Sequence, residues 1–98
     1  MPNNNTNIKL DKFLEPIDVG DWCFHENNLC RVLKINAFKV TILKLFEINN
    51  GKYGASKVNV DAGNIFLIAK DTLDMPQYLK PKVDAINRRF LEETRPKY

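Results

Sequence analysis

Residues 38 to 60 read FKVTILKLFEINNGKYGASKVNV, and this stretch decides the fold. Asn50-Gly51 tolerates the positive φ angles of a tight type I′ turn, whose twist suits a β-hairpin. Residues typical of strands flank the turn on both sides. Pairing outward from it predicts a long hairpin that places Phe46 opposite Ala55 and Lys44 opposite Lys57.

Short strands are also predicted before and after this hairpin. The first runs from Trp22 to His25, the second from Leu29 to Ile35 and the last from Ile65 to Ala69, with turns at residues 26–28 and 61–64. The second has a mixed apolar pattern that indicates a bulge or burial on both faces. The middle strand, from Phe38 to about Ile48, becomes apolar on both faces, which is typical of a strongly bent barrel strand or of a strand covered by a helix.

The C-terminal region carries one apolar stripe at helical spacing. Leu79, Val83, Ile86 and Phe90 are four, three and four residues apart, and Pro81 suits the first turn of a helix. A helix from about Lys82 to Glu93, packed on the strands, is therefore predicted. Residues 71–81 hold too many apolar side chains for a free tether and are expected to lie on the strands.

Residues 1–17 are expected to form a partly disordered N-terminal arm. The polar start, MPNNNTN, has neither the basic nor the apolar region of a secretory signal. The rest of the arm is interrupted by Pro16 and could form one helical turn or lie extended against the barrel. The expected division is thus an arm at 1–17, a β-domain at 18–69, and a linker and helix at 70–98.

The composition indicates a single domain in the cytoplasm. The chain has 98 residues and a formal net charge of +3, and no apolar run approaches the roughly 20 residues that a membrane span needs. Cys23 and Cys30 fit a reducing compartment as free thiols. A two-residue turn at Glu26-Asn27 would, however, place them opposite each other, within reach of a disulfide.

The strand pattern resembles the SH3-like small barrels of the KOW and Tudor type. The resemblance lies in the Val-Gly-Asp-Trp entry at residues 19–22, the Cys-Arg-Val-Leu-Lys-Ile strand at 30–35, the long middle hairpin and the Ile65–Ile68 closing strand. It implies a mainly β (α+β) fold, a five-stranded antiparallel SH3-like barrel with a C-terminal α-helix. Such barrels occur in nucleic-acid-binding proteins, readers of methylated side chains and protein adaptors, so the resemblance leaves the ligand open.

No residue pattern indicates catalysis, a cofactor or a metal. His25 is the only histidine, Ser56 is the only serine and lacks a nucleophile-elbow context, and no glycine-rich loop opens a helix. Cys23, His25 and Cys30 are three metal-ligand types where a structural zinc site needs four. His25 is expected to be a surface residue beside a turn, and Ser56 to lie in an arm of the long hairpin.

Two binding hypotheses remain, and the first is a regulatory or adaptor module that binds a protein partner. It rests on apolar residues beyond the needs of a small barrel, among them Leu43, Leu45, Leu73, Met75 and Tyr78. The second is nucleic-acid binding through lysines of strands two to four beside aromatic rings. Residues 17–69 hold six lysines and arginines against five acids, which favours the protein partner.

Eight residues carry cations or exposed rings that could serve either kind of binding. They are Lys39, Lys44, Phe46, Lys52, Tyr53, Lys57, Arg88 and Arg89. Glu92 and Glu93 stand four residues after the two arginines, and Asp84 four residues before the first. Helical ion pairs are therefore expected to neutralise Arg88 and Arg89.

Overall fold

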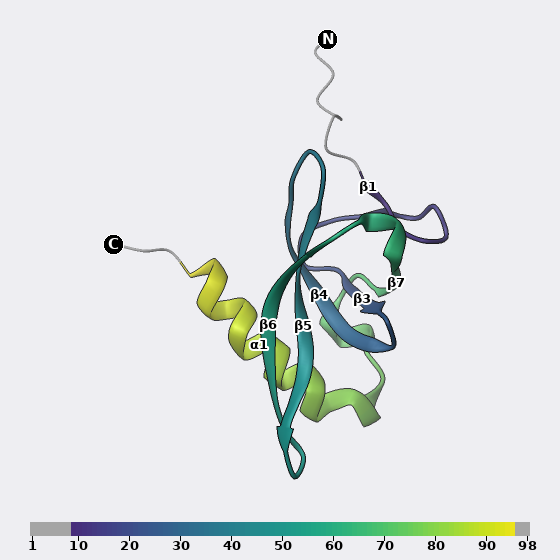
Figure 1. The fold of residues 1–98 in the computed structure, drawn as a ribbon. Coiled ribbons are helices and arrows are strands. Elements are labelled where there is room, and N and C mark those ends of the chain that lie inside the picture. Colours follow the sequence, from purple (N-terminus) through teal and green to yellow (C-terminus); the bar gives the residue numbers. More distant parts are fainter. Residues whose placement is uncertain (1–8, 96–98) are drawn as a thin grey trace.

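A computed structural model describes residues 9–95, and its centre is one five-stranded antiparallel sheet (Figure 1). The strands lie in the order β6-β5-β4-β3-β7. Their bounds are β3 Trp22–His25, β4 Asn28–Ile35, β5 Val40–Asn49, β6 Lys52–Val60 and β7 Ile65–Ala69. A short second sheet pairs β1 (Lys9–Leu10) with β2 (Pro16–Ile17). The five predicted strands are thus confirmed, and the arm takes the extended alternative, whereas the prediction for the first seven residues lies outside the described range.

Three 3₁₀ turns and one α-helix complete the fold. The turns are η1 Ala62–Asn64, η2 Thr72–Asp74 and η3 Gln77–Leu79, and α1 is Lys80–Thr94. Pro81 lies in the first turn of α1, as its fixed φ angle and missing N–H predict. Within residues 9–95 no helix is long and apolar enough to cross a membrane.

The first hairpin has the expected two-residue turn. Glu26 and Asn27 both adopt positive φ angles, 52° and 68°, so Cys23 stands directly opposite Cys30 on the next strand. Both cysteines are buried and free. The predicted bulge in the second strand is also present, because the pairing of β4 with β5 shifts between Val32 and Lys34.

The long hairpin is confirmed, but its predicted register is wrong by one residue. Asn50 and Gly51 take positive φ angles at the turn. Phe46 nevertheless pairs with Gly54, and Lys44 with Ser56. The reason is a bulge between Glu47 and Asn49 that leaves Ile48 without a partner strand residue.

The predicted barrel is wrong, because the sheet is open. Its two edges, β6 and β7, are not hydrogen-bonded to each other. The N-terminal arm occupies the β7 edge: Lys12 N donates to Ile65 O at 2.7 Å, and Leu67 N donates to the Asp11 carboxylate at 2.7 Å. Alternation of apolar residues is the same in an open and in a closed sheet, so the strand pattern could not distinguish them.

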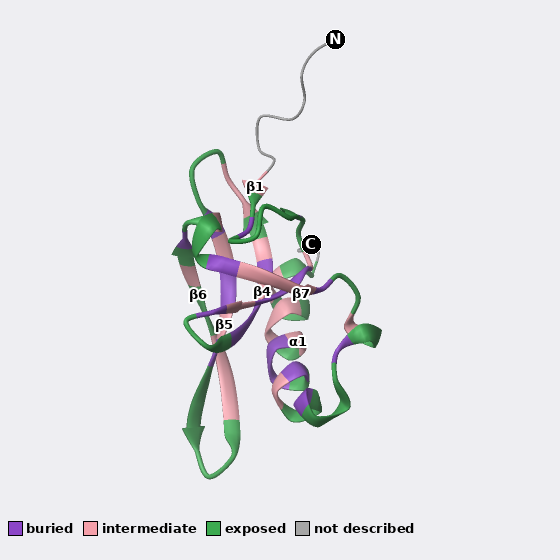
Figure 2. Ribbon diagram, turned by 90° about the vertical axis from the view of Figure 1, so that its right-hand side faces the viewer, coloured by how far each residue is buried: buried purple, intermediate pink, exposed green. Residues whose placement is uncertain are grey.

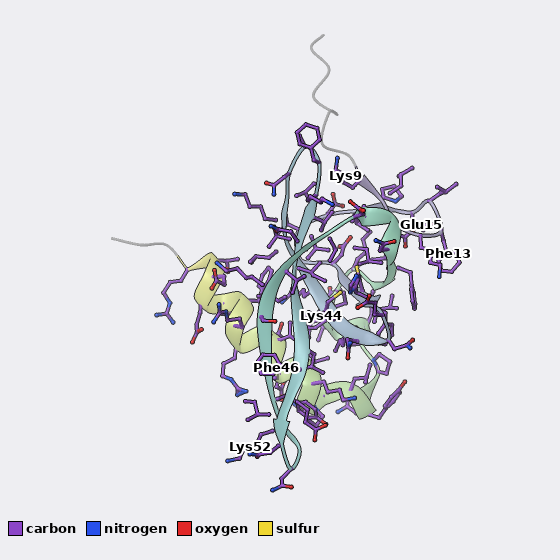
Figure 3. The ribbon with its side chains drawn as sticks, in the orientation of Figure 1. Lys9, Phe13, Glu15, Lys44, Phe46 and Lys52 are labelled. Carbon is purple, nitrogen blue, oxygen red and sulfur yellow. The ribbon has the colours of Figure 1, made fainter. Side chains whose placement is uncertain are left out.

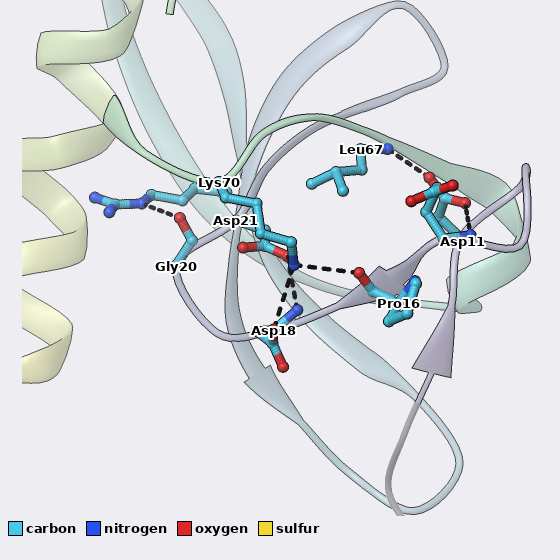
Figure 4. Close-up of polar contacts among 9 residues, drawn as sticks. Asp11, Pro16, Asp18, Gly20, Asp21, Leu67 and Lys70 are labelled. Carbon is cyan, nitrogen blue, oxygen red and sulfur yellow. Dashed lines mark hydrogen bonds and ion pairs between the residues drawn. The ribbon is translucent and has the colours of Figure 1, made fainter. Parts of the chain in front are cut away.

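Lys70, the residue after β7, binds both the end of the same arm and the turn at residues 18–21 that leads into β3 (Figure 4). Lys70 Nζ lies 2.8 Å from a carboxylate oxygen of Asp21, 3.3 Å from Asp18 and 3.2 Å from Pro16 O. The hydrogen bond to Asp21, with smaller contributions from Asp18 and against the effect of burial, raises the pKa of Lys70. The arm is thus part of the folded domain from about residue 9 onward.

Each face of the sheet carries its own apolar cluster. On one face α1 packs over β4, β5 and β6, and Trp22, Leu43 and Ile86 are fully buried there. The other cluster contains both cysteines, and its buried residues are Ile17, Cys23, Cys30, Val32, Val40, Ile42, Val60 and Ile65. The buried side of α1 faces the sheet in Figure 2, so the predicted helix and its stripe are confirmed, and the helix accounts for the doubly apolar middle strand.

The linker is only partly packed. Met75 and Leu79 are buried against α1 and the sheet, as predicted. Leu73 and Tyr78, however, are 90% and 82% exposed. Two of the surplus apolar residues are therefore not used by the fold.

Candidate functional site

Three lysines among the eight candidate residues are neutralised by ion pairs. Lys39 Nζ lies 2.7 Å from Asp61 Oδ1, Lys44 Nζ lies 3.0 Å from Glu26 Oε1, and Lys57 Nζ lies 3.2 Å from Glu93 Oε1. The hydrogen bond from Lys44 lowers the pKa of Glu26. Exposed ion pairs stabilise a fold little, but each pair removes one uncompensated cation from the surface.

Four other candidates meet in one shallow groove between the long hairpin and α1. Phe46 and Tyr53 come from the hairpin, and Arg88 and Arg89 from the helix. The groove has a volume of about 220 Å³, and its remaining lining residues are Gly54, Ala55, Ala85 and Glu92. We call it the hairpin–helix groove.

The hairpin wall of this groove depends on a glycine. The Phe46 ring lies over Gly54, where an added Cβ would come within 2.8 Å of Phe46 Cζ. Phe46 remains 46% exposed. Figure 3 shows Phe46 partway along the hairpin and Lys52 near its tip.

The helix wall is cationic. Arg88 is exposed and makes no hydrogen bond or ion pair with the residues that the structure describes, so its expected helical pairs are absent. The expected pair is present at Arg89, whose guanidinium lies 3.1 Å from Glu93 Oε2. Lys82 Nζ lies 5.7 Å from the centre of the Tyr53 ring. A ligand in the groove would therefore meet Arg88 as an uncompensated charge.

Sequence reasoning misplaced His25. The residue is only 8% exposed, so the predicted surface position is wrong. Its neighbours explain the burial, since β3 lies between β4 and β7 and pairs with both. His25 Nδ1 has no hydrogen-bond partner among residues 9–95 and lies 3.7 Å from Glu26 Oε1. The ring lines a cavity of about 350 Å³ together with Lys12, Gly63 and Asn64.

Another cavity, of about 480 Å³, lies between the sheet and the end of α1. Its polar lining is mostly paired internally, through the Lys57–Glu93 ion pair and a 2.6 Å hydrogen bond between Thr41 and Asn59. Lys34 is exposed at this cavity. No sequence pattern points to this cavity, because its walls come from three strands and a helix.

The cysteines form no reactive or metal site. Burial, with smaller contributions from the charges of Cys30, Asp21 and Asp11, raises the pKa of the Cys23 thiol. Burial also raises the pKa of Cys30, to about 12, against the effect of Lys44. Among residues 9–95 no group of three or more His, Cys, Asp or Glu side chains could hold a metal ion.

Comparisons with known proteins give no match, whether with family models, curated proteins or solved structures. The resemblance to SH3-like small barrels therefore stays a prediction. Any functional reading has to come from the groove and the surfaces around it.

Proposed function

We propose that this protein is a non-catalytic regulatory or adaptor module that binds a protein partner through the hairpin–helix groove. The observation that carries the proposal is the meeting of Phe46, Tyr53, Arg88 and Arg89 in one groove. A partly exposed aromatic ring beside an arginine is typical of the residues that contribute most to protein interfaces.

The surface near the groove supports a protein partner. Ile48, in the bulge of the same hairpin, is 58% exposed. Exposed apolar side chains beside a polar rim favour contact with another protein surface. The two free, buried thiols support the cytoplasmic location expected from the sequence.

Charge pairing argues against nucleic acid as the ligand. Phosphate contacts need cations that are free to replace counterions. Lys39, Lys44 and Lys57 are each held by a carboxylate. Lys34 and Lys52 are in no ion pair with the described residues, but they lie apart: Lys34 is in β4, at the cavity near the end of α1, and Lys52 is at the start of β6.

Selection from a random peptide display library tests this proposal. Peptides enriched on the native protein should bind it in solution, and binding should fall about tenfold or more in Phe46→Ala and in Arg88→Glu. Lys34→Glu makes the same charge change outside the groove and should leave peptide binding unchanged.

The same variants test whether the ligand is a nucleic acid instead of a protein. Labelled single- and double-stranded DNA and RNA would be titrated at low and at moderate salt. A micromolar complex that weakens steeply with salt, and weakens equally in Lys34→Glu and Arg88→Glu, would overturn the protein-partner proposal.

A further inference from the structure

We propose that the partner supplies an extended acidic segment that adds as a sixth strand to the free edge of β6. This inference rests on the proposed function and specifies how the groove is used. Strand addition in a groove between a sheet edge and a helix is an established mode of peptide recognition.

The two edges of the sheet differ in whether their backbone N–H and C=O groups are free to pair with another strand. At β7 the arm already supplies hydrogen bonds to Ile65 O and Leu67 N. At β6 the only strand partner within residues 9–95 is β5. Alternate residues of an edge strand direct their N–H and C=O groups away from the sheet. The nine-residue strand β6 therefore offers a row of unpaired backbone groups that β7 does not.

The groove follows this free edge. Tyr53, Gly54 and Ala55 of β6 form one wall, and Ala85, Arg88 and Glu92 of α1 form the other. Figure 1 shows α1 crossing β6 at an angle, and the two elements are in contact. An added strand lies about 4.8 Å from its neighbour. A segment paired with β6 would thus present alternate side chains to the helix.

The cations beside this edge define the chemistry of the segment. Arg88 has no partner among the described residues, and Lys52 is exposed at the start of β6. Glu92 is the one acid in the lining. Acidic side chains at alternate positions would meet the cations, while apolar ones would cover Phe46 and Ala85.

The lysines of β6 protect this edge strand only weakly against pairing with another strand. Charged side chains, lysine above all, commonly keep an edge strand from pairing. Lys57 is held by Glu93 at 3.2 Å and leans toward α1, which leaves Lys52 at the hairpin end. A second copy of this chain is a poor occupant, because its β6 strand, KYGASKVNV, carries two lysines and no acid and so could not neutralise Arg88.

The probe is a blocked synthetic peptide of alternating valine and glutamate, with alternating valine and lysine as its control. Titration followed by isothermal calorimetry should show the acidic peptide binding at least about tenfold more tightly. Arg88→Glu should abolish this preference, and Lys34→Glu should not.

A scan of N-methylated peptides tests the hydrogen-bonding mode. In an added strand every second peptide N–H bonds to β6, so N-methylation should weaken binding at alternate positions only. Binding without this alternation would overturn strand addition and leave the groove proposal standing. Failure of both peptides to bind would also overturn strand addition. The proposed function is tested separately, by whether Phe46→Ala and Arg88→Glu weaken the binding of the display-selected peptides. A dimer seen by light scattering and dissociated by the peptides would identify a second copy as the occupant and overturn the proposal.

Discussion

At the scale of single residues, Asp11 does most to hold the arm against the sheet. Its side chain is buried, and it accepts hydrogen bonds from the N–H groups of Phe13, Glu15 and Leu67. Burial alone would raise the pKa of Asp11, but the hydrogen bonds from Leu67, Glu15 and Phe13 together outweigh it and lower the pKa below its ordinary value of 3.8. The ionised carboxylate is therefore the form that the fold stabilises.

A pH series tests this directly. The contribution of Asp11 should be fully present above its unfolded pKa, and it should be lost as the pH falls from about 4 through the lower folded pKa. Asp11→Asn should reduce the free energy of unfolding at pH 7 by about 1 to 3 kcal/mol, because one acceptor oxygen becomes a donor. Urea denaturation at several pH values checks both effects. Equal acid sensitivity in the wild type and the variant would contradict this account of Asp11.

The buried thiols give a second residue-scale prediction. The pKa of Cys30 is raised to about 12 and that of Cys23 is raised as well, chiefly by burial. Since the thiolate is the reactive form, neither thiol should react with a disulfide reagent at pH 8 until the protein unfolds. Rapid reaction of the native protein would show that this side of the sheet opens.

At the scale of elements, the docking of α1 depends on one cation that sequence reasoning did not single out. The guanidinium of Arg31 lies 4.0 Å from the centre of the Phe90 ring and 4.8 Å from that of Trp22. It donates to Gly20 O at 2.9 Å and to Asn87 Oδ1 at 2.6 Å. Arg31, a residue of β4, therefore links α1 to Gly20, which lies just before β3.

Substitutions in this contact should release the helix. Phe90→Ala should cost roughly 3 kcal/mol, because it removes both apolar burial and the ring beside Arg31. Leu91→Ala, on the exposed side of the same helix, should cost less than about 0.5 kcal/mol. Thermal and urea unfolding measure both; equal effects would mean that α1 is not an integral part of the domain.

Some features of these elements could be predicted from the sequence, and others could not. The turn at Asn50-Gly51, the stripe along α1 and the opposition of Cys23 and Cys30 follow from local rules of turn geometry and periodicity. The hairpin register did not, because no residue type around Ile48 signals the bulge there. Arg31 escaped notice because its partners lie 11 and 56 residues away along the chain.

At the scale of the whole molecule, the open sheet is the main departure from the sequence prediction, and the candidate groove lies at one of its edge strands, β6. Phe46, Tyr53, Arg88 and Arg89 were predicted as separate candidates, and the structure brings them together beside the free edge. Lys39 and Lys44 belong to ion pairs elsewhere. Tertiary contacts decide which cations are neutralised. Counting charges in the sequence could therefore not separate the ion-paired lysines from the residues of the groove.

The groove geometry gives a prediction about Gly54. An alanine there would press its Cβ against the far end of the partly exposed Phe46 ring. The ring can move, so Gly54→Ala should cost less than about 1 kcal/mol of stability. It should nevertheless weaken binding of display-selected peptides several-fold, by displacing the aromatic wall. Ala62→Gly, a small-residue change in η1 outside the groove, serves as the control and should leave binding intact.

Hydrogen exchange of the backbone amides tests the central claim most directly, with the protein free and saturated by a display-selected peptide. The account predicts new protection at alternate amides of β6 and little change at β7, whose edge the arm already occupies. Protection confined to β7 or to the Lys34 cavity, or protection produced by nucleic acid and by no peptide, would contradict it.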